Sequence, residues 1–154
     1  MQVFPLDPFL WQFWSMVGSA ILCGAIIGLE RQLRGKPAGV RTSCLICLST
    51  AVFLALGRTL AGPDADTTRV LGQVVTGVGF LGAGVMLARG GVVTGVTTAS
   101  VIWTLACIGS TVGLGYPRAA IGLSIVTVAI LTGVELLESG FRRLKEGVYS
   151  REHR

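Results

Sequence analysis

Two residue patterns in this 154-residue chain have spacings that serve chemistry in other proteins. Gly77, Gly79 and Gly82 form a G-x-G-x-x-G sequence, the spacing of the turn that holds the pyrophosphate of a dinucleotide. Cys44 and Cys47 form a C-x-x-C pair, a spacing that occurs in redox and zinc sites. Whether either pattern can act in this way depends on the elements that surround it.

The surroundings argue against both kinds of site. A dinucleotide turn lies between two strands, and an acidic residue about 20 positions later binds the ribose. Here the first acidic residue after Gly82 is Glu135, 53 positions later. The cysteine pair lies in an apolar run without a second pair, and the only histidine is His153. We therefore expect no nucleotide, no cofactor and no metal-binding cysteines. No catalytic triad or P-loop lysine is evident, so we also expect no enzyme.

The composition is that of an integral membrane protein. Hydrophobic residues make up 51% of the chain and charged residues 14%, against a charged share of about 25% in soluble domains. The mean hydropathy is +0.71. The basic residues gather in residues 31–41 and 142–154, without the stripe of interleaved aromatic residues that nucleic-acid binding requires. We attribute the net charge of +5 to membrane topology and expect no nucleic-acid partner.

Five uncharged runs predict membrane-spanning helices. They are residues 11–29, 42–57, 70–88, 90–116 and 119–134. A spanning helix needs about 20 residues, and arginines at the ends of the two shortest runs can extend to the membrane surface. We expect the longest run to include a loop or re-entrant portion near residues 90–95. The predicted fold class is an all-α integral membrane protein with about five transmembrane helices.

The distribution of basic residues predicts the orientation. With the amino terminus outside, the inner loops and tail hold ten Lys and Arg residues and the outer loops hold three. Because cytoplasmic segments are enriched in Lys and Arg, we expect an outer amino terminus and an inner carboxyl terminus. Residues 1–10 are then a periplasmic segment, residues 11–138 the transmembrane domain, and residues 139–154 a basic cytoplasmic tail.

Small residues lie on two faces of the third predicted helix. One face holds Gly72, Thr76, Gly79 and Ala83, and the other holds Gly77 and Gly84. Small faces let helix backbones approach closely in lipid. Two such faces predict a central position for this helix, with a neighbour on each side. The predicted helix-packing residues are Gly72, Gly77, Gly79, Gly82 and Gly84.

The chain also resembles itself. Residues 24–31, GAIIGLER, match residues 82–89, GAGVMLAR, at an offset of 58. Residues 38–43, AGVRTS, match residues 94–99, TGVTTA, at an offset of 56. These matches predict that helices one and two correspond to helices three and four in the same orientation, as in parallel repeats. Chance similarity between helices rich in small residues is the alternative.

Polar residues near the helix ends are the candidates for function. Glu30, among basic residues, is either a cytoplasmic site for a partner or ion or an ion pair that holds the loop. Asp66 is a candidate N-cap, whereas Thr97 and Thr98 are candidates for a cap or an interhelical bond. Gln73 is expected to bond a neighbouring helix. No acidic residue lies at the middle of a span, which weighs against a stand-alone Mg²⁺ carrier.

Three sequence blocks resemble the MgtC/SapB family of bacterial membrane proteins. They are GLERQLRGKPAGVRT at 28–42, DTTRVLGQVVTGVGFLGAGVML at 66–87, and VTGVTTASVIW at 93–103. The order and spacing of the blocks are specific, and the resemblance runs from about residue 24 to residue 138. The candidate functional or partner-contact residues at positions of the family pattern are Glu30, Arg31, Lys36, Arg41, Thr42, Asp66, Arg69, Gln73, Thr97 and Thr98.

The resemblance implies a bacterial inner-membrane protein. Family members are associated with growth at low Mg²⁺ and, in some pathogens, with survival inside macrophages. They are thought to act by binding other membrane proteins, including ATP synthase. Longer members add a soluble cytoplasmic domain, which we expect this chain to lack.

Two functions follow as hypotheses. The first is a protein that supports Mg²⁺ homeostasis by modulating a transporter or ATP synthase. Its expected partners are the lipid bilayer, a membrane protein and a second copy of the chain. The second is an ion channel or transporter for Mg²⁺ or another small ion, formed by an oligomer.

Overall fold

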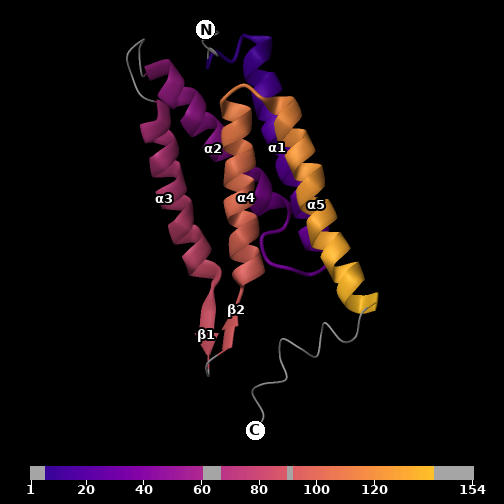
Figure 1. Ribbon diagram of the computed structural model, residues 1–154. Coiled ribbons are helices and arrows are strands. Elements are labelled where there is room, and N and C mark those ends of the chain that lie inside the picture. The colour runs from indigo at the N-terminus through magenta and orange to yellow at the C-terminus, as the bar shows by residue number, and fades with distance from the viewer. Residues whose placement is uncertain (1–5, 61–66, 90–91, 141–154) are drawn as a thin grey trace.

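The computed structural model describes residues 6–60, 67–89 and 92–140. Its elements in chain order are α1 Trp11–Leu33, α2 Val40–Leu60, α3 Thr67–Val85, β1 Leu87–Arg89, β2 Val92–Thr94, α4 Val96–Gly113 and α5 Pro117–Gly140. All five helices in this part of the chain are long and apolar enough to cross a membrane (Figure 1). The protein is therefore a multi-pass, all-α membrane protein, as its composition predicts.

Two helices extend beyond their short uncharged runs. α2 contains 21 residues and α5 contains 24, so each reaches the length of about 20 residues needed to cross the hydrocarbon core. Arg58, near the end of α2, donates a hydrogen bond of 2.7 Å to the carbonyl oxygen of Leu114. Its positive charge thus lies at the negative end of α4, which is the favourable arrangement.

A β-hairpin separates the third and fourth spans. The uncharged run predicts a helix up to residue 88, but α3 ends at Val85 and β1 pairs antiparallel with β2. The β-branched residues of β2 favour an extended backbone. Gly95 has a φ of 88°, a left-handed conformation that suits glycine, and α4 begins directly after it. The loop predicted near residues 90–95 is this hairpin, although residues 90 and 91 lie outside the described chain.

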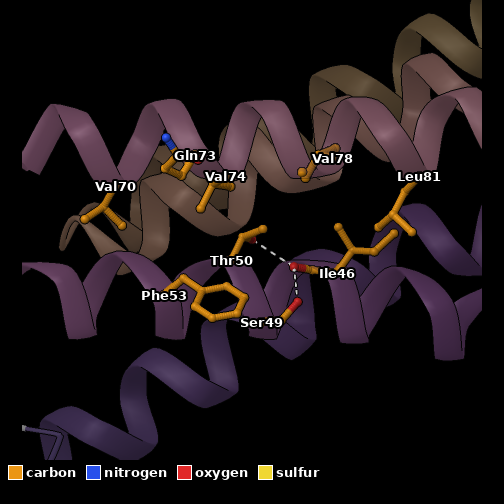
Figure 2. Close-up of a pocket in the computed structure, with 10 residues that line it drawn as sticks. Ile46, Ser49, Thr50, Phe53, Val70, Gln73, Val74, Val78 and Leu81 are labelled. Carbon is orange, nitrogen blue, oxygen red and sulfur yellow. Dashed lines mark hydrogen bonds between the residues drawn. The ribbon is translucent and has the colours of Figure 1, made fainter.

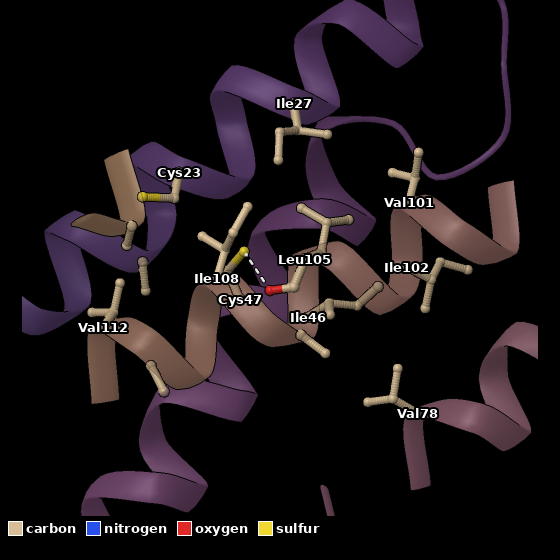
Figure 3. Packing of buried hydrophobic residues seen from close by; sticks show 14 of the residues in the cluster. Cys23, Ile27, Ile46, Cys47, Val78, Val101, Ile102, Leu105, Ile108 and Val112 are labelled. Carbon is tan, nitrogen blue, oxygen red and sulfur yellow. Dashed lines mark hydrogen bonds between the residues drawn. The ribbon is translucent and has the colours of Figure 1, made fainter. Parts of the chain in front are cut away.

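α4 lies at the centre of the bundle. α2 and α3 pack against it, α1 packs along α2, and α5 packs on α1 and α4 (Figure 1). In the core, Leu105 and Ile108 of α4 lie near Ile27 of α1 and Cys47 of α2 (Figure 3). The Cys47 thiol donates a bond of 3.3 Å to the Leu105 carbonyl oxygen. This cysteine therefore packs as a small, nearly apolar residue, as its sequence context predicts.

Glycines permit the closest contact between α1 and α2. A Cβ atom on Gly24 would lie 2.6 Å from Cα of Cys44, and one on Gly28 would lie 2.6 Å from Cα of Val40. Real Cβ atoms do not approach so closely. The two helices can keep this spacing only because both positions lack a side chain.

α4 approaches α2 through two further glycines. A Cβ atom on Gly109 would collide with the Thr50 hydroxyl and would lie 2.8 Å from Cα of Cys47. A Cβ atom on Gly113 would collide with the Ala51 carbonyl oxygen. Backbone contact between α2 and α4 therefore sets the distance between the two helices.

The predicted packing role of the α3 glycines is wrong within this chain. Among the described residues, no packing partner lies within 4 Å of a Cβ atom built on Gly72, Gly77, Gly79 or Gly84. Only Gly82 has one, with Ala99 at 3.8 Å. The predicted central position is wrong as well, because 11% of the apolar stretch of α3 is buried, against 56% in α4. The spacing of glycines shows that another helix could pack closely on α3. It does not show that this other helix belongs to the same chain.

The two helical hairpins point the same way. The connection between α1 and α2 and the β-hairpin between α3 and α4 lie at the same end of the bundle, where α5 also ends (Figure 1). The amino end of α1 lies at the opposite end, which agrees with an odd number of spans. Which end faces the cytoplasm stays a prediction from the basic residues.

The predicted duplication can be compared with the backbone bonds at the starts of α2 and α4. A bond of 3.0 Å runs from the Ser43 N–H to the Gly39 carbonyl oxygen at the start of α2. A bond of 2.9 Å runs from the Ala99 N–H to the Gly95 carbonyl oxygen at the start of α4. Both donor and acceptor are displaced by the offset of 56 seen in the sequence. The same kind of bond, 3.1 Å from the Ala120 N–H to the Tyr116 carbonyl oxygen, opens α5. It is therefore common to helix starts, and the duplication stays a prediction.

Gly109→Ala tests the contact between α2 and α4. The new methyl group would force the helices apart, and we expect the free energy of unfolding to fall by about 1–3 kcal/mol. Chemical unfolding of the purified protein in detergent measures this change. Gly122→Ala in α5 is the control, because an added Cβ there meets nothing within 4 Å. Equal effects of the two substitutions would contradict the proposed close contact.

Candidate functional site

A cluster of charged side chains lies at the end of α1. Glu30 is 8% exposed and Arg31 is 4% exposed. Both are near the connection between α1 and α2, the end predicted to face the cytoplasm. Charged residues are almost never buried to this extent unless they are paired. Their partners therefore define the site.

Arg34 joins Glu30 to the last helix. Its Nε atom lies 2.7 Å from Oε1 of Glu30, one turn earlier on α1. Its Nη1 atom pairs with Oε2 of Glu135 on α5. One guanidinium thus connects two carboxylates from different helices. The second carboxylate oxygen of Glu30 is buried and has no hydrogen-bond partner in the described part of the chain.

Arg31 points to α4 instead. Its Nη2 atom donates a hydrogen bond of 3.2 Å to the hydroxyl of Thr98, which is 4% exposed in the first turn of α4. Its Nε atom is buried and has no hydrogen-bond partner among the described residues. The ion pairs found in this part of the chain both involve Arg34. Arg31 therefore reaches α4 as a charged group without a carboxylate contact.

The structure brings together some of the predicted site residues. Glu30 forms the ion pair that was one of its two predicted roles. Thr98 forms an interhelical bond, whereas the alternative of a cap is wrong, because α4 has no side-chain cap. The predicted site residues that stay exposed at helix ends or in the first loop are Lys36, Arg41, Thr42, Arg69 and Thr97. Asp66 lies outside the described residues.

Gln73 lies apart from the charged cluster. It is exposed on α3 and lines a groove of about 320 Å³ between α2 and α3 (Figure 2). Its predicted bond to a neighbouring helix is not found among the described residues. The other walls are mostly apolar, with Phe53 of α2 facing Val74 of α3. This groove opens along the side of the bundle, where lipid or another protein would lie.

Sequence reasoning did not select Arg34 and Glu135. The spacing of Glu30 and Arg34 by four residues in a helix was a usable signal, because such side chains are neighbours on one face. Glu135 offered no such signal, since α5 approaches α1 only in the folded bundle. No group of three or more His, Cys, Asp or Glu residues in the described chain could hold a metal ion.

A family of known proteins matches nearly the whole part of the chain that the structure describes. The MgtC family matches residues 17–139, which include all five spans from the second turn of α1. The chain belongs to the MgtC family. The MgtC-family match contains Glu30, Arg31, Thr98 and Glu135, so the charged cluster lies inside the shared domain.

Several relatives are longer than this MgtC-family chain. It is 42% identical over 123 residues to "Putative magnesium transporter YhiD" of Escherichia coli, covering 75% of this chain and 57% of that protein. It is 40% identical over 128 residues to "Protein MgtC" of Salmonella typhimurium, covering 83% of this chain and 53% of that protein. It is 37% identical over 116 residues to "Protein MgtC" of Brucella abortus, covering 75% of this chain and 48% of that protein. The chain thus spans about half the length of these relatives. No solved structure matches it.

Arg34→Gln tests the bridge between α1 and α5. The substitution removes the partner of the buried Glu30 carboxylate, so we expect a loss of unfolding free energy of about 1–3 kcal/mol. Glu135→Gln changes a side chain that is 51% exposed, so a loss below about 1 kcal/mol is expected. Chemical unfolding of the purified protein in detergent measures the loss of free energy for both variants. A larger loss of unfolding free energy for Glu135→Gln would show that the buried Glu30 carboxylate is not the main contributor to the stability of this bridge.

Proposed function

We propose that this protein supports magnesium homeostasis in the bacterial inner membrane by binding and modulating another membrane protein. The partner is a transporter or an ATP synthase, and the protein itself is not an enzyme. The printed name of the Escherichia coli relative concerns magnesium, and the MgtC family match covers residues 17–139, nearly all of the described bundle. Because only about half of each relative is covered, the proposal concerns the membrane domain.

The observation that supports a partner is the outer face of α3. Gln73, Gly77, Phe80 and Gly84 are spaced at four, three and four residues, so they share one face. All four are exposed, and Phe80 is 81% exposed. We call these four residues the open face of α3. It is uncharged and lies beside the groove between α2 and α3.

The chemistry of this face fits a transmembrane helix of another protein. Gly77 and Gly84 would let a second backbone approach closely, and close packing drives helix association in lipid. The amide of Gln73 offers a donor and an acceptor to a polar group on the partner. In hydrocarbon such a group is more stable when it is hydrogen-bonded.

A second candidate function is ion transport. The printed name of the Escherichia coli relative supports it, since that name is "Putative magnesium transporter YhiD". Against it, the acidic residues described within the helices lie near one end of the bundle, where Glu30 and Glu135 both pair with Arg34. Of the Glu30 carboxylate, one oxygen is left without a hydrogen bond in the described chain. Mg²⁺ is bound through oxygen ligands, usually with one or two carboxylates. Transport would therefore require coordination by carbonyl oxygens or by an oligomer.

A flux measurement separates the two functions. Purified protein in liposomes is expected to give Mg²⁺ entry equal to that of protein-free liposomes, because the described bundle presents no free carboxylate path. A fluorescent Mg²⁺ indicator inside the vesicles measures entry. Rapid Mg²⁺ entry into vesicles that contain this protein alone would overturn the modulator proposal.

Gly77→Leu tests the open face of α3. A host strain without the gene is expected to grow poorly at limiting Mg²⁺ and to recover when the wild-type gene is returned. We expect Gly77→Leu to abolish recovery, since the new side chain keeps the partner helix away. Gly122→Leu on α5 is the matched control and should restore growth. Immunoblots of the membrane fraction must show equal amounts of both variants, and full recovery by Gly77→Leu would contradict the assignment of the face.

A further inference from the structure

Within the described part of the chain, the first turn of α4 has hydrogen-bond donors without an acceptor. The bond from the Ala99 N–H to the Gly95 carbonyl is the backbone bond that opens the helix, and α4 has no side-chain cap. The N–H groups of Val96, Thr97 and Thr98 therefore have no acceptor within the helix. Together with the helix dipole, they give this end a partial positive charge.

Arg31 adds a full positive charge at the same place. Its side chain is buried against the first turn of α4 and donates to Thr98, while its Nε atom has no partner among the described residues. The neighbouring carboxylate of Glu30 attracts Arg31 electrostatically but makes no contact with it. Its Oε1 atom lies 2.7 Å from Arg34, and its Oε2 atom has no hydrogen-bond partner among the described residues. A buried arginine without a carboxylate contact is unfavourable, and a positive helix end beside it increases the cost. An anion at this position would compensate both charges.

A hydroxyl and a groove lie beside these donors. Thr97 is exposed in the first turn of α4, and the groove between α4 and α5 starts at Val96 and Thr97. Its volume is about 320 Å³. The hydroxyls of Ser100, Thr104 and Thr127 in the groove bond carbonyl oxygens of their own helices. The hydroxyl of Thr97 makes no such bond in the described chain and can donate to a ligand.

We propose that Arg31, Thr97 and the free N–H groups of the first turn of α4 form a binding site for a phosphate group. Helix amino ends and arginine side chains are the two protein groups best suited to phosphate oxygens. The phosphate belongs either to a lipid headgroup or to a free phosphate ion. For a lipid, the groove between α4 and α5 offers space for an acyl chain. The site is separate from the open face of α3, so either proposal can fail without the other.

Binding to the purified full-length protein in neutral detergent tests the site. The probes are inorganic phosphate, with chloride at equal ionic strength as control, and short-chain phosphatidylglycerol, with diacylglycerol as control. We expect phosphate or phosphatidylglycerol to raise the unfolding temperature and the controls to leave it unchanged. A response to phosphatidylglycerol alone identifies the lipid as the source, and a response to inorganic phosphate identifies the free ion. No response to either probe would overturn the proposal.

Three variants locate the effect. Arg31→Gln is expected to weaken probe binding by about tenfold or more, because it removes the charge-assisted bonds. It should also raise the unfolding temperature without the probe, because it removes a buried charge that lacks a carboxylate contact. Thr97→Val changes an exposed residue, so it folds, and it should weaken binding several-fold. Arg41→Gln, an exposed substitution that removes the same charge, is the control. Unchanged binding in both Arg31→Gln and Thr97→Val would exclude the site.

Discussion

Close glycine contacts of α2 with α4 and with α1 set the spacing of the three helices at the core of the bundle. Lipid supplies no hydrophobic drive between helices, so association depends on close packing. Gly109 and Gly113 permit that packing because their missing side chains leave room for Thr50 and for the backbone of α2. With these two helices fixed, α4 has neighbours on most of its surface. α1, α3 and α5 are then arranged around the pair.

The same geometry explains why the buried charged residues of the described chain, Glu30 and Arg31, lie at one end of the bundle. α4 begins where α1 ends, so the first turn of α4 faces Arg31 and Thr98 accepts its hydrogen bond. α5 passes the same end, and Arg34 connects it to α1 through Glu135. The described bundle therefore has a charged end, whose contacts involve α1, α4 and α5, and an uncharged side at α3. The two surfaces therefore differ in charge and in the kind of contact that they can make.

Hydropathy predicted the five helices because membrane thickness sets their length and excludes charge from their middle. It did not predict the end of α3 at Val85, since the residues of the β-hairpin are as apolar as a helix in the membrane. The ion pair of Arg34 with Glu135 joins distant parts of the chain, so no local pattern reports it. The packing role predicted for the α3 glycines is wrong within this chain for another physical reason. A small face predicts close approach but does not identify the approaching surface.

The two hairpins that the predicted duplication would relate differ in how closely they pack. Gly24 would place a Cβ atom 2.7 Å from the Ser43 carbonyl oxygen, whereas its counterpart Gly82 would place one 3.8 Å from that of Ala99. The first hairpin is thus tightly closed and the second is looser. Counterparts at the offset of 58 also differ, because the first hairpin has Glu30 before Arg31 where the second has Ala88 before Arg89. The first hairpin thus contains the buried charged residues and the tight glycine contact between α1 and α2. In the second hairpin the helix at the position of α1 is α3, and its glycines Gly77 and Gly84 stay exposed.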